Sequence, residues 1–328
     1  MQTCTTFEFS LFEFSSHLSR FCIKSIRARD SFASTFAGRG RAQAGLLAKD
    51  TNMDALRSVF SSAPAASQGN KMASKPINVL ITGTNRGIGL EMVKQMVADK
   101  GRVKTLFACC RDPNGPRAEA LQELAKKHPD IITIVTMDVK CLDSIKEAAK
   151  LIGPKVGEDG LNLLVNNAGI SLEGNLQETT PEQMRDSFET NVMGPMNIMR
   201  EFLPLLRVAA KASKISGMSC NKAAVINIST MEASMDITKY SYTEAAVLPF
   251  RVSKAALNML TVCASEEFKK EKILFTLMHP GWVRTDSGGE YAEIDVDKSV
   301  KGILKVMSTM GEKQCALLLD YQGKTQPW

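Results

Sequence analysis

Short apolar runs alternate with amphipathic segments from residue 75 to the end of the chain. The runs are rich in Ile, Val and Leu, as strands are when helices cover both faces of a parallel sheet. They lie at 77–82, 105–110, 131–136, 161–165, 223–228, 273–278 and 316–319. Helical spacing of apolar residues is found near 87–99, 116–127, 141–152, 181–207, 252–270 and 296–308. This alternation predicts an α/β fold: a single doubly wound Rossmann-type domain over residues 72–328, with a seven-stranded parallel sheet and helices on both faces.

Residues 1–71 have a different composition from the rest of the chain. They hold eight of the fourteen Phe and eleven Ser, and they show no sustained helical or strand periodicity. The segment has the basic residues of a mitochondrial presequence, at Arg20, Lys24, Arg27 and Arg29. Its acidic residues do not suit such a presequence. We interpret the segment as a disordered or targeting-like extension, with a gene-model artefact as an alternative. The expected compartment is the cytoplasm, or the mitochondrion if the presequence is genuine.

Composition and charge exclude several classes of function. The net charge is +6, and residues 1–71 account for most of it, with nine Lys/Arg against five Asp/Glu. The nearly neutral remainder has no basic surface for nucleic acid. The chain has no apolar stretch long enough to predict a membrane span. Its eight cysteines form no CxxC pair and it has only three histidines, so we expect no metal site.

A glycine-rich turn follows the first predicted strand. The sequence Thr82-Gly-Thr-Asn-Arg-Gly-Ile-Gly89 leads from that strand into a helix, and its glycines suit a tight turn, close approach to a pyrophosphate and close helix–sheet packing. The helix N-terminus offers unpaired N–H groups to phosphate. A purely structural turn is the alternative, but the place of the turn between strand and helix favours dinucleotide binding. The expected contacts are Gly83, Thr84, Asn85, Arg86, Gly87, Ile88 and Gly89.

Two arginines favour NADP(H) over NAD(H) as the cofactor. Sites that prefer NAD place an acid after the second strand to hold the ribose 2′-hydroxyl. Here Arg111 follows that strand, and Arg86 lies inside the glycine turn. Guanidinium groups suit a 2′-phosphate because they bind it through two hydrogen bonds at once. In the alternative interpretation, Arg111 only begins a solvated loop.

Four motifs together resemble the short-chain dehydrogenase/reductase family. They are the glycine turn, Asp138-Val139, Asn166-Asn-Ala-Gly169 and Pro280-Gly281, and the resemblance covers residues 76–328. Beyond the glycine turn and Arg111, the resemblance implies these cofactor contacts: Asp138, Val139, Asn167, Ala168, Gly169, Lys254, Pro280, Gly281, Val283 and Thr285.

The C-terminal part of the chain resembles one branch of that family in particular. The segment from His279 to Asp286 and the final Pro327-Trp328 are similar to the C-factor and sniffer-like carbonyl reductases. This resemblance implies reduction of a small carbonyl compound by hydride transfer from NADPH. It also implies a homodimer or homotetramer.

The family's chemistry uses an Asn, a Ser and a Tyr–Lys pair. The resemblance assigns the water-holding asparagine to Asn191 and the lysine that holds the nicotinamide ribose to Lys254. The serine that orients the carbonyl falls at Thr230, with Ser229 beside it. Pro195 supports Asn191, because a proline without an N–H frees the carbonyl of residue 191 to hold water. A Gly-Pro kink that serves packing alone is the alternative.

Phe250 stands where the family has the tyrosine that protonates the alkoxide, four residues before Lys254. Acid–base catalysis contributes about 10² to 10⁴ in rate, so the missing phenol predicts little activity without another donor. Tyr242, in the long loop between Thr230 and Phe250, is the candidate substitute, and packing at the surface or the substrate cleft is its alternative role. Two hypotheses remain: an NADP(H)-dependent reductase of a small carbonyl compound, and an NADP-binding pseudoenzyme that acts as a sensor or dimer partner.

Overall fold

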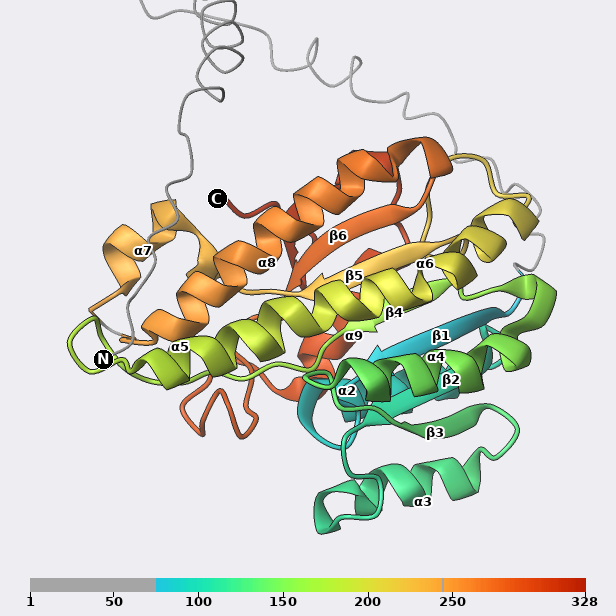
Figure 1. Cartoon of the computed structure of the whole chain (residues 1–328), viewed down its shortest axis with the longest axis horizontal. Coiled ribbons are helices and arrows are strands. Elements are labelled where there is room, and N and C mark those ends of the chain that lie inside the picture. The colour runs from blue at the N-terminus through green and yellow to red at the C-terminus, as the bar shows by residue number, and fades with distance from the viewer. Residues whose placement is uncertain (1–74, 244) are drawn as a thin grey trace, which may run out of the picture. The chain divides into compact units, whose positions relative to one another are not determined.

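The computed structural model describes residues 75–243 and 245–328, and the predicted extension over residues 1–71 lies outside them. The domain is built on one seven-stranded sheet, all parallel, in the order β3-β2-β1-β4-β5-β6-β7 (Figure 1). This order confirms the predicted doubly wound sheet. The strands are β1 (Ile77–Thr82), β2 (Val103–Cys110), β3 (Ile132–Thr136), β4 (Leu163–Asn166), β5 (Ala224–Ile228), β6 (Leu274–His279) and β7 (Leu318–Asp320).

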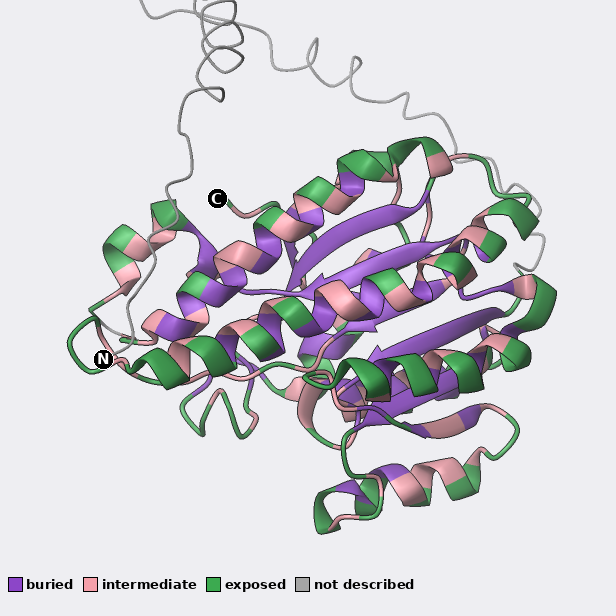
Figure 2. Cartoon of the chain, in the orientation of Figure 1, coloured by how far each residue is buried: buried purple, intermediate pink, exposed green. Residues whose placement is uncertain are grey.

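Helices cover both faces of the sheet, as the apolar strands predict. One face packs against α2 (Gly87–Ala98), α3 (Glu119–Lys127) and α9 (Val296–Met307). The other packs against α4 (Leu142–Val156), α6 (Gly194–Ala212) and α8 (Leu248–Glu267). Figure 2 shows the central strands as almost continuously buried between these two layers.

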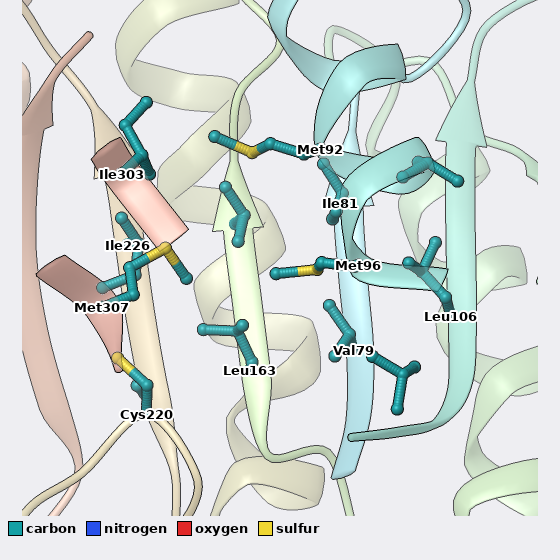
Figure 3. Packing of buried hydrophobic residues seen from close by; sticks show 14 of the residues in the cluster. Val79, Ile81, Met92, Met96, Leu106, Leu163, Cys220, Ile226, Ile303 and Met307 are labelled. Atoms are coloured by element: carbon teal, nitrogen blue, oxygen red, sulfur yellow. The ribbon is translucent and has the colours of Figure 1, made fainter. Parts of the chain in front are cut away.

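Side chains alternate between the two layers along each strand. Val79 and Ile81 of β1 lie in one core with Met92 and Met96 of α2 (Figure 3), whereas Leu80 between them lies in the opposite core. This period of two is what a strand buried on both faces requires.

Adjacent Cys109 and Cys110 of β2 follow the same alternation, since they belong to the two opposite cores. Burial raises the pKa of both thiols. They are therefore packing residues of the strand, and not reactive thiolates.

The structure corrects two expectations. The predicted single helix over 181–207 is interrupted: α5 (Pro181–Phe188) runs into a π-helical turn (Glu189–Met193) before α6 begins. The connection from β5 to α8 is not only a loop, because it contains the short helix α7 (Met235–Ser241). That helix is too short for a periodic pattern, and its sequence signal is the cap, where the Ser234 hydroxyl accepts a hydrogen bond from the Ile237 N–H at 3.2 Å.

Within residues 75–243 and 245–328, no helix is long and apolar enough to cross a membrane. In the same part of the chain, no three His, Cys, Asp or Glu side chains are grouped so that they could hold a metal ion.

Candidate active site

A cleft of about 870 Å³ lies at the carboxyl ends of the strands. Its position follows from the topology: the chain continues from β1 to β2 and β3 on one side, then crosses to β4 on the other. The loops after β1 and β4 separate at such a switch point and leave a crevice for a ligand. Twelve of the predicted cofactor contacts line the cleft: Gly83, Asn85, Arg86, Gly87, Ile88, Arg111, Asp138, Val139, Asn167, Ala168, Gly169 and Thr285.

The glycine turn brings backbone groups to the floor of this cleft. Gly83 has φ +67°, a left-handed conformation that glycine adopts without strain. A β-carbon at Gly89 would lie 2.2 Å from the Gly83 carbonyl oxygen, so only glycine lets α2 start this close to the strand. Arg86 at the helix N-cap makes no side-chain cap, and the first turn carries no acidic residue. The helix N-terminus is therefore suited to an anion.

The segment after β4 holds this turn in place. The Asn167 side-chain amide donates to the carbonyls of Thr82 at 2.8 Å and Gly83 at 3.1 Å. The Thr82 hydroxyl accepts from the N–H groups of Asn167 and Ala168. Thr84, predicted as a cofactor contact, instead points inward: its side chain is buried and donates to the Cys109 carbonyl at 3.1 Å.

Arginines mark one end of the cleft. Arg86, Arg111 and Arg117 all line it, and Arg86 also pairs with Asp286 at 3.2 Å across the opening. Sequence reasoning missed Arg117, because it lies six residues beyond Arg111, in the 3₁₀ turn Pro116–Ala118 that leads into α3, and matches no motif. Its signal was the concentration of basic residues after the second strand.

Asn191, Lys254 and Gly169 meet near the same point of the cleft. A β-carbon at Gly169 would lie 3.1 Å from Asn191 Oδ1 and 3.4 Å from Lys254 Nζ. Lys254 Nζ is buried, donates to the Ile228 carbonyl at 2.7 Å and lies 5.8 Å from the centre of the Phe250 ring. Burial lowers the pKa of Lys254 to about 8.

Asn191 lies in the π-helical turn between α5 and α6. Its amide accepts from the Ile170 N–H at 2.9 Å and donates to the Ile170 carbonyl at 2.9 Å and the Ser253 hydroxyl at 3.0 Å. The Gly194 N–H bonds to the Glu189 carbonyl, one residue further back than in an α-helix. The irregularity predicted from the Gly-Pro pair therefore falls at the asparagine.

The two hydroxyls after β5 have separate roles. Ser229 is buried and donates to Asn258 Oδ1 of α8 at 2.6 Å. The Thr230 hydroxyl accepts from the Glu232 N–H at 3.1 Å and so caps the turn after the strand. The position that resembles the family's serine is therefore a threonine, and its hydroxyl caps the turn that follows β5.

The rings of Tyr242 and Phe250 lie beside different cations. The Tyr242 ring is partly buried and lies 5.6 Å from the Arg251 guanidinium carbon. The ring over the Lys254 ammonium is that of Phe250. The structure thus joins Tyr242 to Arg251, which sequence reasoning did not single out.

The segment after β6 forms the opposite wall of the cleft. Thr285 lines the cleft, whereas Pro280, Gly281 and Val283 support it from behind: the Ser299 hydroxyl donates to the Pro280 carbonyl at 2.6 Å, and Val283 forms a bridge with the chain at residue 294. Gly281 has φ +85°, and a β-carbon there would lie 2.6 Å from an Ile294 methyl group. These three residues position Thr285.

His279 precedes this segment and is buried beside β7. Burial lowers its pKa to about 4, so the imidazole is neutral near pH 7. This protonation state fits a structural histidine better than a general acid.

Comparison with known proteins agrees with this geometry. An uncharacterized oxidoreductase of Schizosaccharomyces pombe is 32% identical over 271 residues, which cover 76% of this chain and 96% of that protein. A carbonyl reductase from chicken fatty liver, solved with NADPH bound, has 42% identity and a TM-score of 0.73 over 77% of this chain and 100% of its own. The carbonyl reductase Sniffer of Drosophila melanogaster has 34% identity and a TM-score of 0.73 over the same shares.

The C-signal protein of Myxococcus xanthus is 31% identical over 175 residues, which cover 51% of this chain and 93% of that protein. Residues 77–294 match the sequence profile of the short chain dehydrogenases. The match begins with β1 and ends after the segment that carries Thr285, so it includes all the residues that line the cleft except Val296. The chain belongs to the short-chain dehydrogenase family.

Proposed function

We propose that this protein is an NADP(H)-dependent oxidoreductase that reduces a small carbonyl compound. The observation that carries the proposal is the continuity of one cleft, from the glycine turn at Gly83 to the meeting point of Asn191, Gly169 and Lys254. A dinucleotide fits this cleft, because the glycine turn lines it and the N-terminus of α2 beside the turn has no acidic residue and no side-chain cap. The solved carbonyl reductases with 42% and 34% identity support the same reaction class.

The chain's own residues divide the work along the cleft. When bound, the nicotinamide supplies the hydride. The N-terminus of α2 and the glycine turn bind the pyrophosphate, and Lys254 holds the nicotinamide ribose with its buried ammonium. The Thr230 hydroxyl orients the carbonyl oxygen, and Asn191 fixes the backbone beside it at Ile170. Each of these groups is held by a second interaction, which keeps the site preorganised.

The alkoxide that forms on hydride transfer must be protonated, and this chain lacks the family's tyrosine as the donor. Phe250 has no proton to give, and Lys254, whose pKa is about 8, is protonated at neutral pH and lies beside its ring. We propose that the proton comes from solvent or from Lys254, with Tyr242 as a further candidate. An NADP-binding protein without turnover is the alternative that Phe250 raises, and the activity assay below separates the two.

The arginine end of the cleft supports NADP(H) over NAD(H). Arg111→Ser should weaken NADPH binding about 10- to 100-fold while changing NADH binding little, because a charge-assisted pair with the 2′-phosphate contributes about 1.5–3 kcal/mol. Titration of the intrinsic fluorescence with each cofactor measures both affinities. Lys301→Ser, on the outer surface of α9, is the matched control. An equal loss for both cofactors would contradict the role of Arg111 in this preference.

The low pKa of Lys254 predicts how cofactor affinity depends on pH. Its ammonium attracts the anionic cofactor, so NADPH binding favours the protonated form and takes up a proton. We expect the affinity to fall about tenfold as pH rises through about 8, the change produced by a one-unit rise of this pKa on binding. Lys140 also lines the cleft, but ion pairs with Asp186 and Glu189 raise its pKa, so it stays charged.

Calorimetric titration with NADPH across this pH range measures the effect. Lys254→Met should bind NADPH more weakly at neutral pH and lose the dependence. A pH dependence that persists in Lys254→Met would assign it to another group.

We further propose a homodimer formed through the outer sides of α6 and α8. Val252 and Met259 of α8 and Val208 of α6 are exposed, and so is Met193 just before α6. Exposed apolar side chains gathered on neighbouring helices suit a contact between copies. Light scattering of the purified chain, compared with Met259→Lys, tests this arrangement.

For the compartment we propose the cytoplasm, with imaging of a fluorescent fusion of the full chain as its test.

The activity test is NADPH oxidation by the full chain with aldehydes, ketones and quinones. Carbonyl-dependent oxidation with NADPH preferred over NADH is the expected result. NADPH binding without turnover of any carbonyl by the natural chain would contradict the reductase and favour the cofactor-binding alternative, and activity that appears only in Phe250→Tyr would show a reductase scaffold whose chemistry is switched off.

A further inference from the structure

Segment 231–247 crosses the edge of the sheet where the site lies. It leaves β5 directly after Thr230 and enters α8 just before Phe250, and Figure 1 shows α7 beside the start of α8. Two other parts of the chain meet it. The Gly174 N–H donates to the Ala246 carbonyl at 2.8 Å, and the Asp236 N–H donates to the carbonyl of the C-terminal Trp328 at 3.1 Å. Because ligands of such folds bind outside the carboxyl ends of the strands, the segment lies on the side of the sheet where a substrate would bind.

One side chain connects this segment to α8. Arg251 is 4% exposed, and its Nη1 and Nη2 lie within hydrogen-bond distance of five acceptors in the segment, whereas its Nε–H has no partner among the described residues. These are the Glu232 carbonyl at 3.4 Å, the Thr238 hydroxyl at 3.2 Å, the Ser241 hydroxyl at 3.1 Å, the Ser241 carbonyl at 3.0 Å and the Ala245 carbonyl at 3.2 Å.

The guanidinium also has a charge partner and an aromatic neighbour. It forms an ion pair with the Glu232 carboxylate, and the Tyr242 ring lies 5.6 Å from its central carbon. A buried charge with this many partners is expensive to disturb, because removing it leaves the Glu232 carboxylate and several carbonyls without their donor.

The place of Arg251 in the helix connects the segment to the chemistry. Arg251 follows Phe250 and precedes Lys254 by three residues, so one turn of α8 carries the ring position, the ribose-binding ammonium and the anchor of the wall. Apart from Lys254, the proposed cofactor contacts lie outside α8, among them those at the glycine turn and after β4. A change at Arg251 therefore acts on the substrate region and not on the dinucleotide floor.

We propose that Arg251, paired with Glu232, is the positioning residue that fixes segment 231–247 as the wall of the carbonyl pocket and thereby sets the affinity for the carbonyl substrate. This role rests on the proposed reductase function. A lysine cannot replace the arginine fully, because a single ammonium cannot reach the five acceptors that the planar fork serves.

The chain supplies a matched control for this interaction. Arg207 makes a two-point pair with Glu271 at 2.7 and 2.9 Å and lies 5.5 Å from the Phe268 ring. It therefore combines the same arginine–carboxylate and arginine–aromatic contacts, but at the far end of α8. Because the Arg207 side chain is 42% exposed, this site controls for the loss of an arginine–carboxylate pair and an arginine–aromatic contact away from segment 231–247.

The test compares Arg251→Met, Arg251→Lys, Glu232→Gln and Arg207→Met in the full chain. Hydrogen exchange measures the order of segment 231–247, and steady-state kinetics measures the KM and kcat for a carbonyl substrate. For Arg251→Met we expect exchange in the segment and carbonyl KM to rise about tenfold or more, because hydrogen bonds to a charged group are lost. The Kd of NADPH should stay within about twofold, since the glycine turn lies elsewhere and Lys254 keeps its own hydrogen bond to the Ile228 carbonyl.

Arg251→Lys and Glu232→Gln should give smaller changes in the same direction, and they replace Arg251→Met in the test if that variant does not fold. Arg207→Met should leave both the exchange of the segment and the carbonyl KM unchanged. The kinetics are repeated in the Phe250→Tyr background, where turnover is expected to be faster.

Several results would overturn the proposal. Unchanged exchange in segment 231–247 would show that Arg251 does not hold it. Raised exchange with unchanged KM, or an equal change of KM in Arg207→Met, would reduce its role to stability alone. Absence of turnover in both the natural and Phe250→Tyr backgrounds, with NADPH still bound, would refute the reductase function and this role with it. If turnover is slow but measurable and Arg251→Met leaves the carbonyl KM unchanged, only the role of Arg251 would be refuted.

Discussion

Phe250→Tyr is expected to raise the kcat for carbonyl reduction by about 10² to 10⁴, the usual contribution of a positioned general acid. The reason is local: the ring already lies 5.8 Å from the Lys254 ammonium, and the substitution adds a phenol that this positive charge acidifies. NADPH affinity should not change, because Phe250 does not line the dinucleotide cleft. Stopped-flow or steady-state NADPH oxidation with one carbonyl substrate, for both chains, measures the ratio.

Phe250→Leu is the control for this substitution, since it changes the ring without adding a proton donor. It should leave turnover near that of the natural chain. If Phe250→Tyr is no faster than the natural chain although both turn over, a proton donor other than residue 250 already acts. Tyr242→Phe and the pH profile of Lys254→Met would then identify that donor.

Gly89→Ala is expected to cost about 1–3 kcal/mol of unfolding free energy, or more, and to weaken NADPH binding at least about tenfold. The new β-carbon would lie 2.2 Å from the Gly83 carbonyl oxygen and 2.6 Å from Asn167 Nδ2. The start of α2 must therefore shift away from the turn that faces the cofactor. Chemical denaturation measures the first effect and fluorescence titration the second.

Gly153→Ala in α4 is the matched control, because it too replaces a helical glycine. The β-carbon there would meet only a Leu205 methyl group at 3.9 Å, so the change should stabilise the helix by about 1 kcal/mol or less and leave NADPH binding unchanged. Equal NADPH affinity in Gly89→Ala and the natural chain would contradict the role of this close approach in cofactor binding.

The sheet could be predicted from the sequence because each strand is a short apolar run buried on both faces. Val79, Leu80 and Ile81 show why this signal is strong: successive side chains enter opposite cores, so all of them must be apolar. The right-handed crossovers of β–α–β units then make the sheet parallel, whereas the order of the strands was not predicted.

The cofactor side of the site was similarly visible, because a glycine turn between strand and helix has a fixed mechanical use. The motif did not predict the placement of every residue near the cofactor. Thr84 lies within the motif yet its hydroxyl points inward to the Cys109 carbonyl, since alternate residues of a turn face opposite sides. Arg117 lines the cleft from the 3₁₀ turn before α3, and the helical pattern predicted near 116–127 did not show that this side chain faces the cleft.

The substrate side could not be predicted, because it depends on contacts between distant segments. No sequence pattern predicts that the Arg251 side chain forms hydrogen bonds with residues six to nineteen positions earlier in the chain. The π-helical turn at Asn191 was only partly visible: Pro195 indicates a lost hydrogen bond, but the wider turn that absorbs it depends on the packing of α5 and α6.

The most direct test of the proposed reaction follows a deuterium atom from the cofactor to the product. The full natural chain is incubated with NADPH deuterated at C4 of the nicotinamide, on either face, and with an aryl aldehyde or ketone, and the alcohol is analysed by mass spectrometry. We predict deuterium on the former carbonyl carbon from one face of the cofactor only, slowly in the natural chain and faster in Phe250→Tyr. Unlabelled product, or no alcohol from either chain while NADPH binds, would contradict the assignment of this cleft to carbonyl reduction.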